Sequence, residues 1–187
     1  MPKRGLRQLM LARRKALPVT AWRSASWLAQ QALIETGEFA AARTVALYAP
    51  VHNEVETAQV LHAALASAKV VLFPAVCPGG LEFRHISNPA AVQRGPFGIP
   101  EPDATCPVHS PEEADLIVIP GVAFDLDGER IGYGKGYYDK ALHGLEGKGR
   151  LVGFCYDFQL VEEIGGEPHD VRMDLIITER RVIRPRD

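Results

Sequence analysis

Cysteine is scarce in this sequence of 187 residues, and long apolar runs are absent. The three cysteines, Cys77, Cys106 and Cys155, form no CxxC pair, and their odd number argues against a disulfide framework or a zinc site. No apolar run approaches the roughly 20 residues that a membrane-spanning helix requires. We therefore expect a cytoplasmic protein in a reducing compartment, with no membrane partner.

Acidic residues are also absent from the start of the chain, where the first is Glu35. The basic residues that precede it are Lys3, Arg4, Arg7, Arg13, Arg14, Lys15 and Arg23. This start lacks the apolar segment of a secretory signal peptide, although mitochondrial transit peptides are also rich in arginine and poor in acid. The whole chain has a formal net charge of -2, which argues against a nucleic-acid partner.

Strand-like and helix-like segments alternate along the chain and predict an α/β fold. With 47% hydrophobic and 24% charged residues, the chain is sized for a single domain with a substantial core. We expect two N-terminal helices followed by a layered, mostly parallel central sheet that is flanked by helices. The expected helices cover residues 3–17, 20–36, 57–68 and a segment from 137. The expected strands cover residues 44–48, 70–73, 81–84, 116–119, 151–155 and 175–178, with a last one near 182–183.

Local signals refine two parts of this prediction. In the second helix we expect Thr20 to be the N-cap, Gly37 to end the helix, and its apolar face to consist of Trp27, Leu28, Ala32 and Leu33. Residues 86–111 are dense in proline and glycine and predict a long ordered loop over the mouth of an active site. Ligands of parallel sheets bind beyond the carboxyl ends of the strands, so the functional groups that follow the strands are expected in one cleft.

A glycine-rich loop lies between the strand at 116–119 and the helix that starts at 137. In it Tyr133 and Lys135 alternate with three glycines, Gly132, Gly134 and Gly136. Such glycines let backbone N–H groups approach an anion, and Lys135 would add a point charge to a phosphate. The spacing is neither that of a P-loop nor that of a Rossmann fingerprint. A plain turn with a solvated lysine is the alternative.

Three cations of the first helix share one side of it. At 100° per residue, Lys3, Arg7 and Arg14 fall within about 40° of each other. A phosphate would fit such a group, whereas the simpler interpretation is a solvated basic stripe.

The stretch PGVAFDLDGERIGYGKGYYDKAL, residues 120–142, closely resembles the signature region of the 5-formyltetrahydrofolate cyclo-ligase family, also called 5,10-methenyltetrahydrofolate synthetase. The resemblance extends to the K-x-x-L-R start of the first helix and to Y-x-P-x-x-x-E-V-x-T at residues 48–57. It also includes G-I-x-E-P at residues 98–102 and PHDVRMDLIITE at residues 168–179. Ile131 and Lys140 are mild departures, because leucine and arginine are commoner there.

This resemblance implies that 5-formyltetrahydrofolate and ATP are converted to 5,10-methenyltetrahydrofolate, ADP and phosphate through an N5-iminium phosphate. Catalysis would depend on Lys3, Arg7 and Lys135, which neutralise charge on the transferred phosphoryl group. Asp139 and Asp174 would hold Mg²⁺, whereas each alone is typical of an N-cap or a surface charge. The implied ATP-binding set is Lys3, Arg7, Arg130, Gly132, Tyr133, Gly134, Lys135, Gly136 and Asp139.

The family also implies a pterin contact for Glu54, since one carboxylate can accept two hydrogen bonds from adjacent N–H groups. Without the resemblance, Glu54 would be read as a capping or surface charge. The implied substrate-binding set is Tyr48, Val51, Glu54, Phe83 and Tyr138, although a buried strand position is the stronger interpretation of Phe83. His169 and Asp170 form either a proton-handling pair or a structural hydrogen bond. We expect a monomer or weak homodimer that binds 5-formyltetrahydrofolate with or without a polyglutamate chain.

Two other functions stay open. A folate- or nucleotide-binding module of the same fold need not keep the aspartates that bind Mg²⁺. A sugar-phosphate isomerase or acyl-transfer enzyme would need a base or nucleophile near the anion loop, and only Glu54 is available. Dependence on ATP separates all three.

Overall fold

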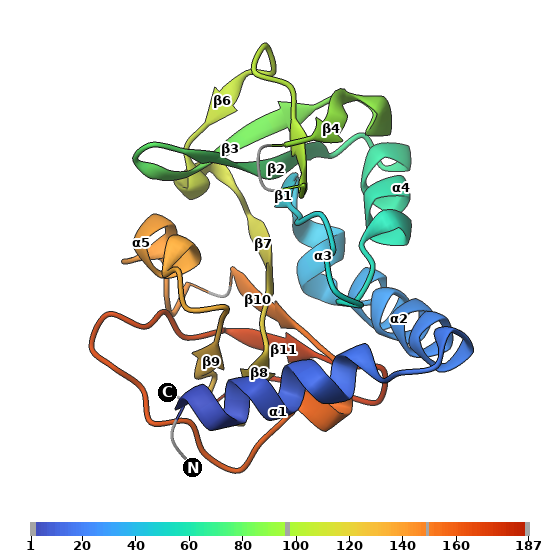
Figure 1. The fold of residues 1–187 in the computed structure, drawn as a ribbon. Coiled ribbons are helices and arrows are strands. Elements are labelled where there is room, and N and C mark those ends of the chain that lie inside the picture. Colours follow the sequence, from blue (N-terminus) through green and yellow to red (C-terminus); the bar gives the residue numbers. More distant parts are fainter. Residues whose placement is uncertain (1–2, 96–97, 149, 186–187) are drawn as a thin grey trace.

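An eight-stranded sheet with helices on both faces forms the centre of the structure (Figure 1). The structure is a computed structural model that describes residues 3–95, 98–148 and 150–185. The strands of this sheet are β1 (Thr44–Ala46), β2 (Val70–Cys77), β3 (Gly80–Ile86), β6 (Val108–His109), β7 (Leu116–Pro120), β10 (Leu151–Phe154), β11 (Leu175–Ile177) and β12 (Val182–Ile183). Their order is β12-β11-β10-β7-β1-β2-β3-β6.

The centre of this sheet is parallel. Strands β11, β10, β7, β1 and β2 run in one direction, whereas β12 pairs antiparallel at one edge and β3 and β6 at the other. The predicted α/β fold with a mostly parallel sheet is therefore confirmed.

Successive residues of the central strands point into two different cores, as the pleat of a strand requires. Val45 faces the core covered by α2 (Val19–Ile34), α3 (Gly37–Ala41) and α4 (Ala58–Ala66). Ala46 faces the core covered by α5 (Tyr137–Leu142). Because both faces are covered, β7 and β10 are buried almost throughout, which explains their continuous apolar runs.

The first helix, α1 (Lys3–Lys15), packs on a hairpin rather than on the main sheet. The hairpin consists of β8 (Ala123–Phe124) and β9 (Arg130–Ile131), which the sequence did not predict as strands. Met10 of α1 lies in a small core with Val122 and Ile131. Figure 1 shows the helix next to β8 and β9, and Arg7 of the helix donates a hydrogen bond to the carbonyl of Gly132 in the loop that follows β9.

The predictions about the second helix need correction. Thr20 lies inside α2, which starts at Val19 without a side-chain cap, and Gly37 begins α3 instead of ending α2. Trp27 and Leu28 are 49% and 44% exposed, so they do not form the buried face. The face that packs inward has helical spacing and consists of Ser26, Ala29, Gln30 and Leu33.

Residues 86–111 do not form one long loop, although 96–97 lie outside the described residues. The segment contains β4 (Val92–Arg94) and β5 (Pro100–Pro102), which pair as a two-stranded sheet, and then β6. Strands of two or three residues are too short to leave a periodic pattern, so the sequence does not predict them. Part of this segment does reach the cavity described below.

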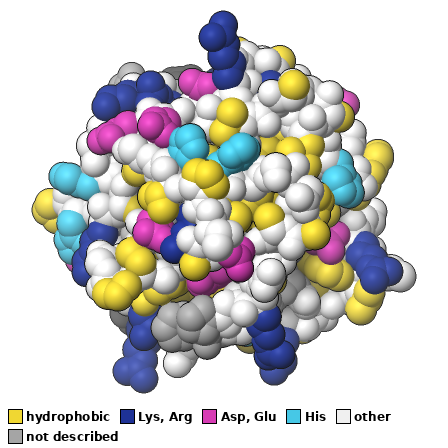
Figure 2. All heavy atoms as spheres, turned by 90° about the horizontal axis from the view of Figure 1, so that it is seen from above, with side chains coloured by type: hydrophobic (Ala, Val, Ile, Leu, Met, Phe, Trp, Pro, Cys, Tyr) yellow, Lys and Arg dark blue, Asp and Glu magenta, His cyan; other side chains and the backbone are white. Residues whose placement is uncertain are grey.

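The outer surface carries both signs of charge. On the face shown in Figure 2, basic and acidic side chains are interspersed, and hydrophobic side chains gather toward the centre of the view. None of the helices in the described part of the chain has the length and apolar character needed to cross a membrane.

Candidate active site

A cavity of about 610 Å³ opens near the carboxyl ends of β1, β2 and β7, where a parallel sheet is expected to bind ligands. Tyr48 and Ala49 follow β1, Pro74 belongs to β2, and Pro120 ends β7. All predicted site residues except Phe83 and Asp174 line this cavity. They are Lys3, Arg7, Tyr48, Val51, Glu54, Arg130, Gly132, Tyr133, Gly134, Lys135, Gly136, Tyr138 and Asp139.

The glycine loop forms one wall and is held against α1. Arg7 Nε donates a hydrogen bond of 2.8 Å to the carbonyl of Gly132. Gly134 and Gly136 have φ values of +93° and +66°, which L side chains rarely adopt. A Cβ at Gly134 would also lie 3.6 Å from Arg7 Cζ, so the guanidinium follows the loop backbone closely.

Lys135 projects from this wall as an exposed side chain. Within the described ranges, its amino group takes part in no hydrogen bond or ion pair that would have to be broken before it met an anion. Lys135 is therefore suited to bind a phosphate, as a loop lysine should be.

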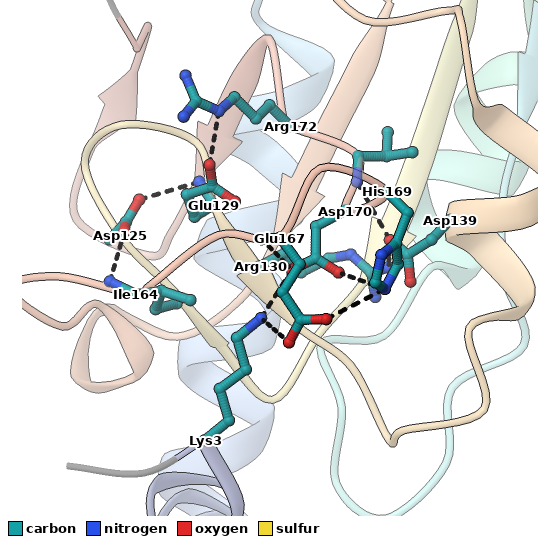
Figure 3. Close-up of polar contacts among 11 residues, drawn as sticks. Lys3, Asp125, Glu129, Arg130, Asp139, Ile164, Glu167, His169, Asp170 and Arg172 are labelled. Carbon is teal, nitrogen blue, oxygen red and sulfur yellow. Dashed lines mark hydrogen bonds and ion pairs between the residues drawn. The ribbon is translucent and has the colours of Figure 1, made fainter.

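Lys3 already has acidic partners on the rim of the cavity (Figure 3). Its Nζ lies 2.7 Å from Asp170 Oδ2 and 3.2 Å from Glu167 Oε1. Partial burial opposes the charge, but these carboxylates raise the pKa of Lys3. His169 Nε2 lies 3.3 Å from Glu167 and 3.9 Å from Asp170, so the closest ionic partner of Asp170 is Lys3 rather than its neighbour in sequence.

Asp139 is fixed by Arg130, the residue of β9 that leads into the glycine loop. The Nη2 of Arg130 lies 2.8 Å from Asp139 Oδ1, which also accepts a bond of 3.3 Å from the N–H of Val171 (Figure 3). Arg130 Nη1 reaches the carbonyl of Pro120, and the guanidinium lies 5.8 Å from the ring centroid of Tyr138. Asp139 therefore lines the cavity with one carboxylate oxygen, Oδ1, already accepting hydrogen bonds.

The structure does not bring Asp174 to the cavity. One carboxylate oxygen accepts the N–H of Gly147, and the other accepts the N–H groups of Arg150 and Leu151. Asp174 thus stands at the amino ends of β10 and β11, whereas the cavity is near the carboxyl ends of the parallel strands. These contacts are structural, and they separate Asp174 from Asp139.

Phe83 is also placed elsewhere. It is 1% exposed and packs in the core beneath α5, so the buried strand position is correct and the predicted stacking on a ligand is wrong. Leu81 lies two residues earlier on the same face of β3 and lines the cavity, whereas Phe83 lies further along that face and is covered by the core.

Glu54 is a buried carboxylate, 3% exposed, in the loop between β1 and α4. Its Oε1 accepts a bond of 2.8 Å from the Tyr133 hydroxyl, and its Oε2 accepts one of 2.9 Å from the N–H of Val51. Arg14 Nη2 lies 3.8 Å from Oε1. Burial raises the pKa of Glu54, while Arg14 and the two hydrogen bonds oppose that rise.

Tyr48 holds the loop between β1 and α4 through two hydrogen bonds. Its hydroxyl donates a bond of 2.7 Å to the carbonyl of Val55, and its own carbonyl accepts the Thr57 hydroxyl at 2.8 Å. Tyr48 is only 2% exposed, so it shapes the floor of the cavity and holds Glu54 in place.

Several lining residues were not in the predicted set. The apolar ones carry no chemical signal in a single sequence; they include Pro74, Val76, Leu81, Ile99 and Pro100. Glu101 lies in the G-I-x-E-P segment and is buried in the cavity wall. Arg14 does not line the cavity but contacts Tyr133 and Glu54, which do, and its alignment with Lys3 and Arg7 on one side of the helix is the sequence signal that points to it.

The chain was compared with known proteins. The family model described as the 5-formyltetrahydrofolate cyclo-ligase family matches residues 1–179. A 5-formyltetrahydrofolate cyclo-ligase of Mycolicibacterium smegmatis is 34% identical over 148 residues, covering 75% of this chain and 76% of that protein. One from Escherichia coli K12 is 30% identical over 75% of this chain and 80% of the relative.

Solved structures give the same result. The NMR structure of Aquifex aeolicus 5,10-methenyltetrahydrofolate synthetase has a TM-score of 0.87 and 36% identity, and covers 100% of this chain and 94% of that one. A 5,10-methenyltetrahydrofolate synthetase from Mycoplasma pneumoniae has a TM-score of 0.77 and 28% identity, covering 96% and 99% of the two chains. The fold, the cavity and these matches together lead to one conclusion: the chain belongs to the 5-formyltetrahydrofolate cyclo-ligase family.

Proposed function

We propose that this protein converts 5-formyltetrahydrofolate and ATP to 5,10-methenyltetrahydrofolate, ADP and phosphate. The observation that carries the proposal is the lining of the 610 Å³ cavity. One part of it presents a glycine loop with Lys3, Arg7 and Lys135, and another presents a buried carboxylate at Glu54 beside apolar walls. A reaction that transfers a phosphoryl group from a polyphosphate to a planar heterocyclic substrate needs both parts in one cavity.

The folate would bind at the part around Glu54. A pterin presents an N–H and an amino group side by side, and an ionised carboxylate can accept both hydrogen bonds. Leu81 and Ile99 offer apolar contact area for a planar ring, and Tyr138 lies nearby in the lining. The formyl group would then point toward the glycine loop.

The phosphates would bind along the glycine loop. Lys135 is available as it stands, Arg7 follows the loop backbone, and Lys3 would exchange its carboxylate partners for phosphate oxygens. Three cations and the backbone N–H groups would neutralise the oxygens of the group in transfer. Alignment of the formyl oxygen with the γ-phosphorus supplies the other requirement, because an amide oxygen is a weak nucleophile.

In the proposed reaction two bonds between heavy atoms form and two break, and N10 also loses a proton to the departing phosphate or to water. The formyl oxygen forms a bond with the γ-phosphorus as the bond to ADP breaks, which gives an N5-iminium phosphate. N10 of the folate then forms a bond with the formyl carbon and gives up its proton, and the carbon–oxygen bond breaks to release phosphate. No covalent intermediate with a protein side chain is required.

Magnesium would bind through one protein carboxylate. In the residues that the structure describes, no group of three or more His, Cys, Asp or Glu side chains is placed to hold a metal. Mg²⁺ on a nucleotide needs only one or two carboxylates beside phosphate oxygens and water. Asp139 fits this requirement, because Arg130 and Val171 engage only its Oδ1. Bound Mg²⁺ would offset phosphate charge.

The test is a spectroscopic assay of methenyl-folate formation with and without ATP. We expect product only when ATP and 5-formyltetrahydrofolate are both present, with ADP released in equal amount. Folate binding without turnover would instead support a binding module that has lost catalysis. Absence of folate binding would contradict the proposal.

A further inference from the structure

Arg14 is the largest of the fully buried side chains and is only 1% exposed. Arginine is almost never buried to this extent unless its charge and its donors have partners. Here Nε donates a bond of 2.9 Å to the carbonyl of His52, and Nη1 donates one of 3.1 Å to the carbonyl of Gly121. Nη2 donates to the hydroxyl of Tyr133 and faces Glu54.

Arg14 therefore joins three segments that are distant in sequence. His52 and Glu54 belong to the loop after β1, Gly121 follows β7, and Tyr133 belongs to the glycine loop. The simple carbonyl contacts would suffice to hold α1 in place. The contacts on Nη2 differ, because they are directed at an ionisable group in the cavity.

Tyr133 is the second member of this arrangement. Its backbone lies in the glycine loop, but its hydroxyl accepts a hydrogen bond from Arg14 and donates one of 2.8 Å to Glu54 Oε1. The ring lies beside the guanidinium, with Arg14 Cζ 5.7 Å from its centroid. A hydroxyl held between a cation and a carboxylate orients the carboxylate and favours its ionised form.

We propose that Arg14 is a positioning residue that acts on Glu54 directly and through the Tyr133 hydroxyl, and keeps this buried carboxylate ionised and oriented to accept hydrogen bonds from the pterin. This inference rests on the proposed function, which supplies the ligand of Glu54. It adds a residue that need not touch either substrate and gives Tyr133 a role at the folate part of the cavity.

The groups around Glu54 determine whether its pKa rises or falls when Arg14 or the Tyr133 hydroxyl is removed. Arg14 faces Glu54 from α1, and Tyr133 faces it from the glycine loop. Tyr138 of α5 and Tyr48, which follows β1, are further titratable groups near Glu54. The His52 ring lies 6.2 Å from the ring of Tyr133. Burial raises the pKa of Glu54, and Arg14 is the strongest of the groups that hold it down. Loss of Arg14 or of the Tyr133 hydroxyl would therefore raise the pKa further.

The consequence is a pH dependence of folate binding. The pterin needs two acceptor oxygens, so its affinity is full where Glu54 is ionised and falls as the pH drops through the pKa of Glu54. If the pKa rises, the same loss occurs at a higher pH. The acidic midpoint of binding is the pH at which half of the folate affinity is lost. Loss of a residue with only a structural role would change the stability of the protein without moving this midpoint.

The experiment compares the parent protein with Tyr133→Phe and Arg14→Lys by calorimetric titration of 5-formyltetrahydrofolate over a range of pH. Tyr133→Phe keeps the ring of a residue that is 39% exposed, so it should fold as the parent does. We expect Tyr133→Phe to move the acidic midpoint of binding to higher pH and to weaken binding near neutral pH by roughly 3- to 10-fold, and Arg14→Lys, which keeps the charge but loses the fixed contacts of the guanidinium, to move the midpoint less. Tyr156→Phe removes a buried hydroxyl outside the cavity and is the matched control, with an unchanged midpoint.

A second measurement does not depend on the ligand. Carbon-13 NMR of protein labelled at its glutamate carboxyl groups follows the titration of Glu54, and Glu54→Gln identifies its signal. An unchanged Glu54 pKa in Tyr133→Phe, with a folded protein, overturns the inference even if folate binds. A parent protein that binds no folate overturns the proposed function, and the NMR titration still decides whether Arg14 and Tyr133 control Glu54.

Discussion

Arg130 and Asp139 form an ion pair of 2.8 Å that joins the strand before the glycine loop to the helix after it. Both side chains lie in the lining of the cavity, and Arg130 is 8% exposed. The two ends of the loop are therefore fixed, while Lys135 at its tip is exposed. Substitutions at the tip are expected to change ligand binding, whereas substitutions at the ends also change stability.

Lys135→Ala tests the tip. We expect kcat/KM for ATP to fall by roughly 100-fold, because a preorganised cation at the transferred phosphate is lost. Folate affinity and the melting temperature should stay close to those of the parent. Lys140→Ala, which removes an exposed lysine of α5 outside the cavity, is the control. Equal ATP kinetics in Lys135→Ala and Lys140→Ala would show that the lysine of the glycine loop takes no part in the use of ATP.

Glu54→Gln tests pterin recognition. Glutamine keeps the size of the side chain but places a donor where an acceptor is needed. The loss of a charge-assisted, buried hydrogen bond costs about 2–3 kcal/mol, or roughly 30- to 150-fold in affinity. Calorimetric titration should show this loss for 5-formyltetrahydrofolate and little change for ATP, with Glu56→Gln as a control outside the cavity. A loss confined to ATP would refute the assignment of Glu54 to the pterin.

Asp139→Asn and Asp174→Asn should have different effects. Asp139→Asn is expected to raise the magnesium concentration needed for half-maximal turnover. Asp174→Asn replaces a carboxylate that accepts three backbone N–H groups, so it should lower the free energy of unfolding by about 1–3 kcal/mol. Its magnesium titration curve should match that of the parent. A shifted magnesium titration curve for Asp174→Asn would show that Asp174 takes part in magnesium binding.

Asp170→Asn tests the ion pair with Lys3 through the pH dependence of stability. Partial burial opposes its charge, but hydrogen bonds from Lys3 and from the N–H of Glu167 lower the pKa of Asp170 below 3.8. The folded state thus binds fewer protons than the unfolded state, so this stabilisation is complete above the ordinary pKa and is lost as the pH falls through the lowered one. Urea unfolding at a series of pH values should show a shallower acidic limb for Asp170→Asn than for the parent.

Gly153→Ala tests the packing of β10. A Cβ at this position would lie 2.5 Å from Phe124 Cε1, which is itself buried beneath the sheet. We expect a loss of about 1–3 kcal/mol in the free energy of unfolding, measured by urea denaturation. Gly79→Ala places its methyl group in open space and should change stability little. Similar values for the two variants would contradict the packing argument.

The parts of the site that are encoded locally could be predicted from the sequence. Gly134 and Gly136 adopt left-handed conformations, and the lysine between them is exposed beside the cavity. Glu54 follows the first strand and lies near its carboxyl end. In each case the neighbouring sequence determines which end of the sheet the group lies at, whereas the orientation of Glu54 also depends on Tyr133 and Arg14.

The parts that depend on packing could not be predicted in the same way. Asp174 precedes its strand, and its carboxylate accepts N–H groups at the amino end of the sheet. The sequence alone does not distinguish this role from metal binding in a cleft, because an aspartate can serve either. The direction of Phe83 depends on how β3 pairs with β2. Trp27 looks apolar in the sequence, but α2 turns the face with Ala29 and Leu33 inward, and no local rule fixes that rotation.

The contact between Lys3 and Asp170 spans 167 positions in the sequence. During synthesis on the ribosome, α1 leaves the exit tunnel well before Glu167 and Asp170. Chains fold from the N-terminus as they emerge, and contacts between distant segments form slowly. Lys3 therefore stays without these two acidic partners until Asp170 emerges, and the part of the cavity wall that the three residues form closes only then.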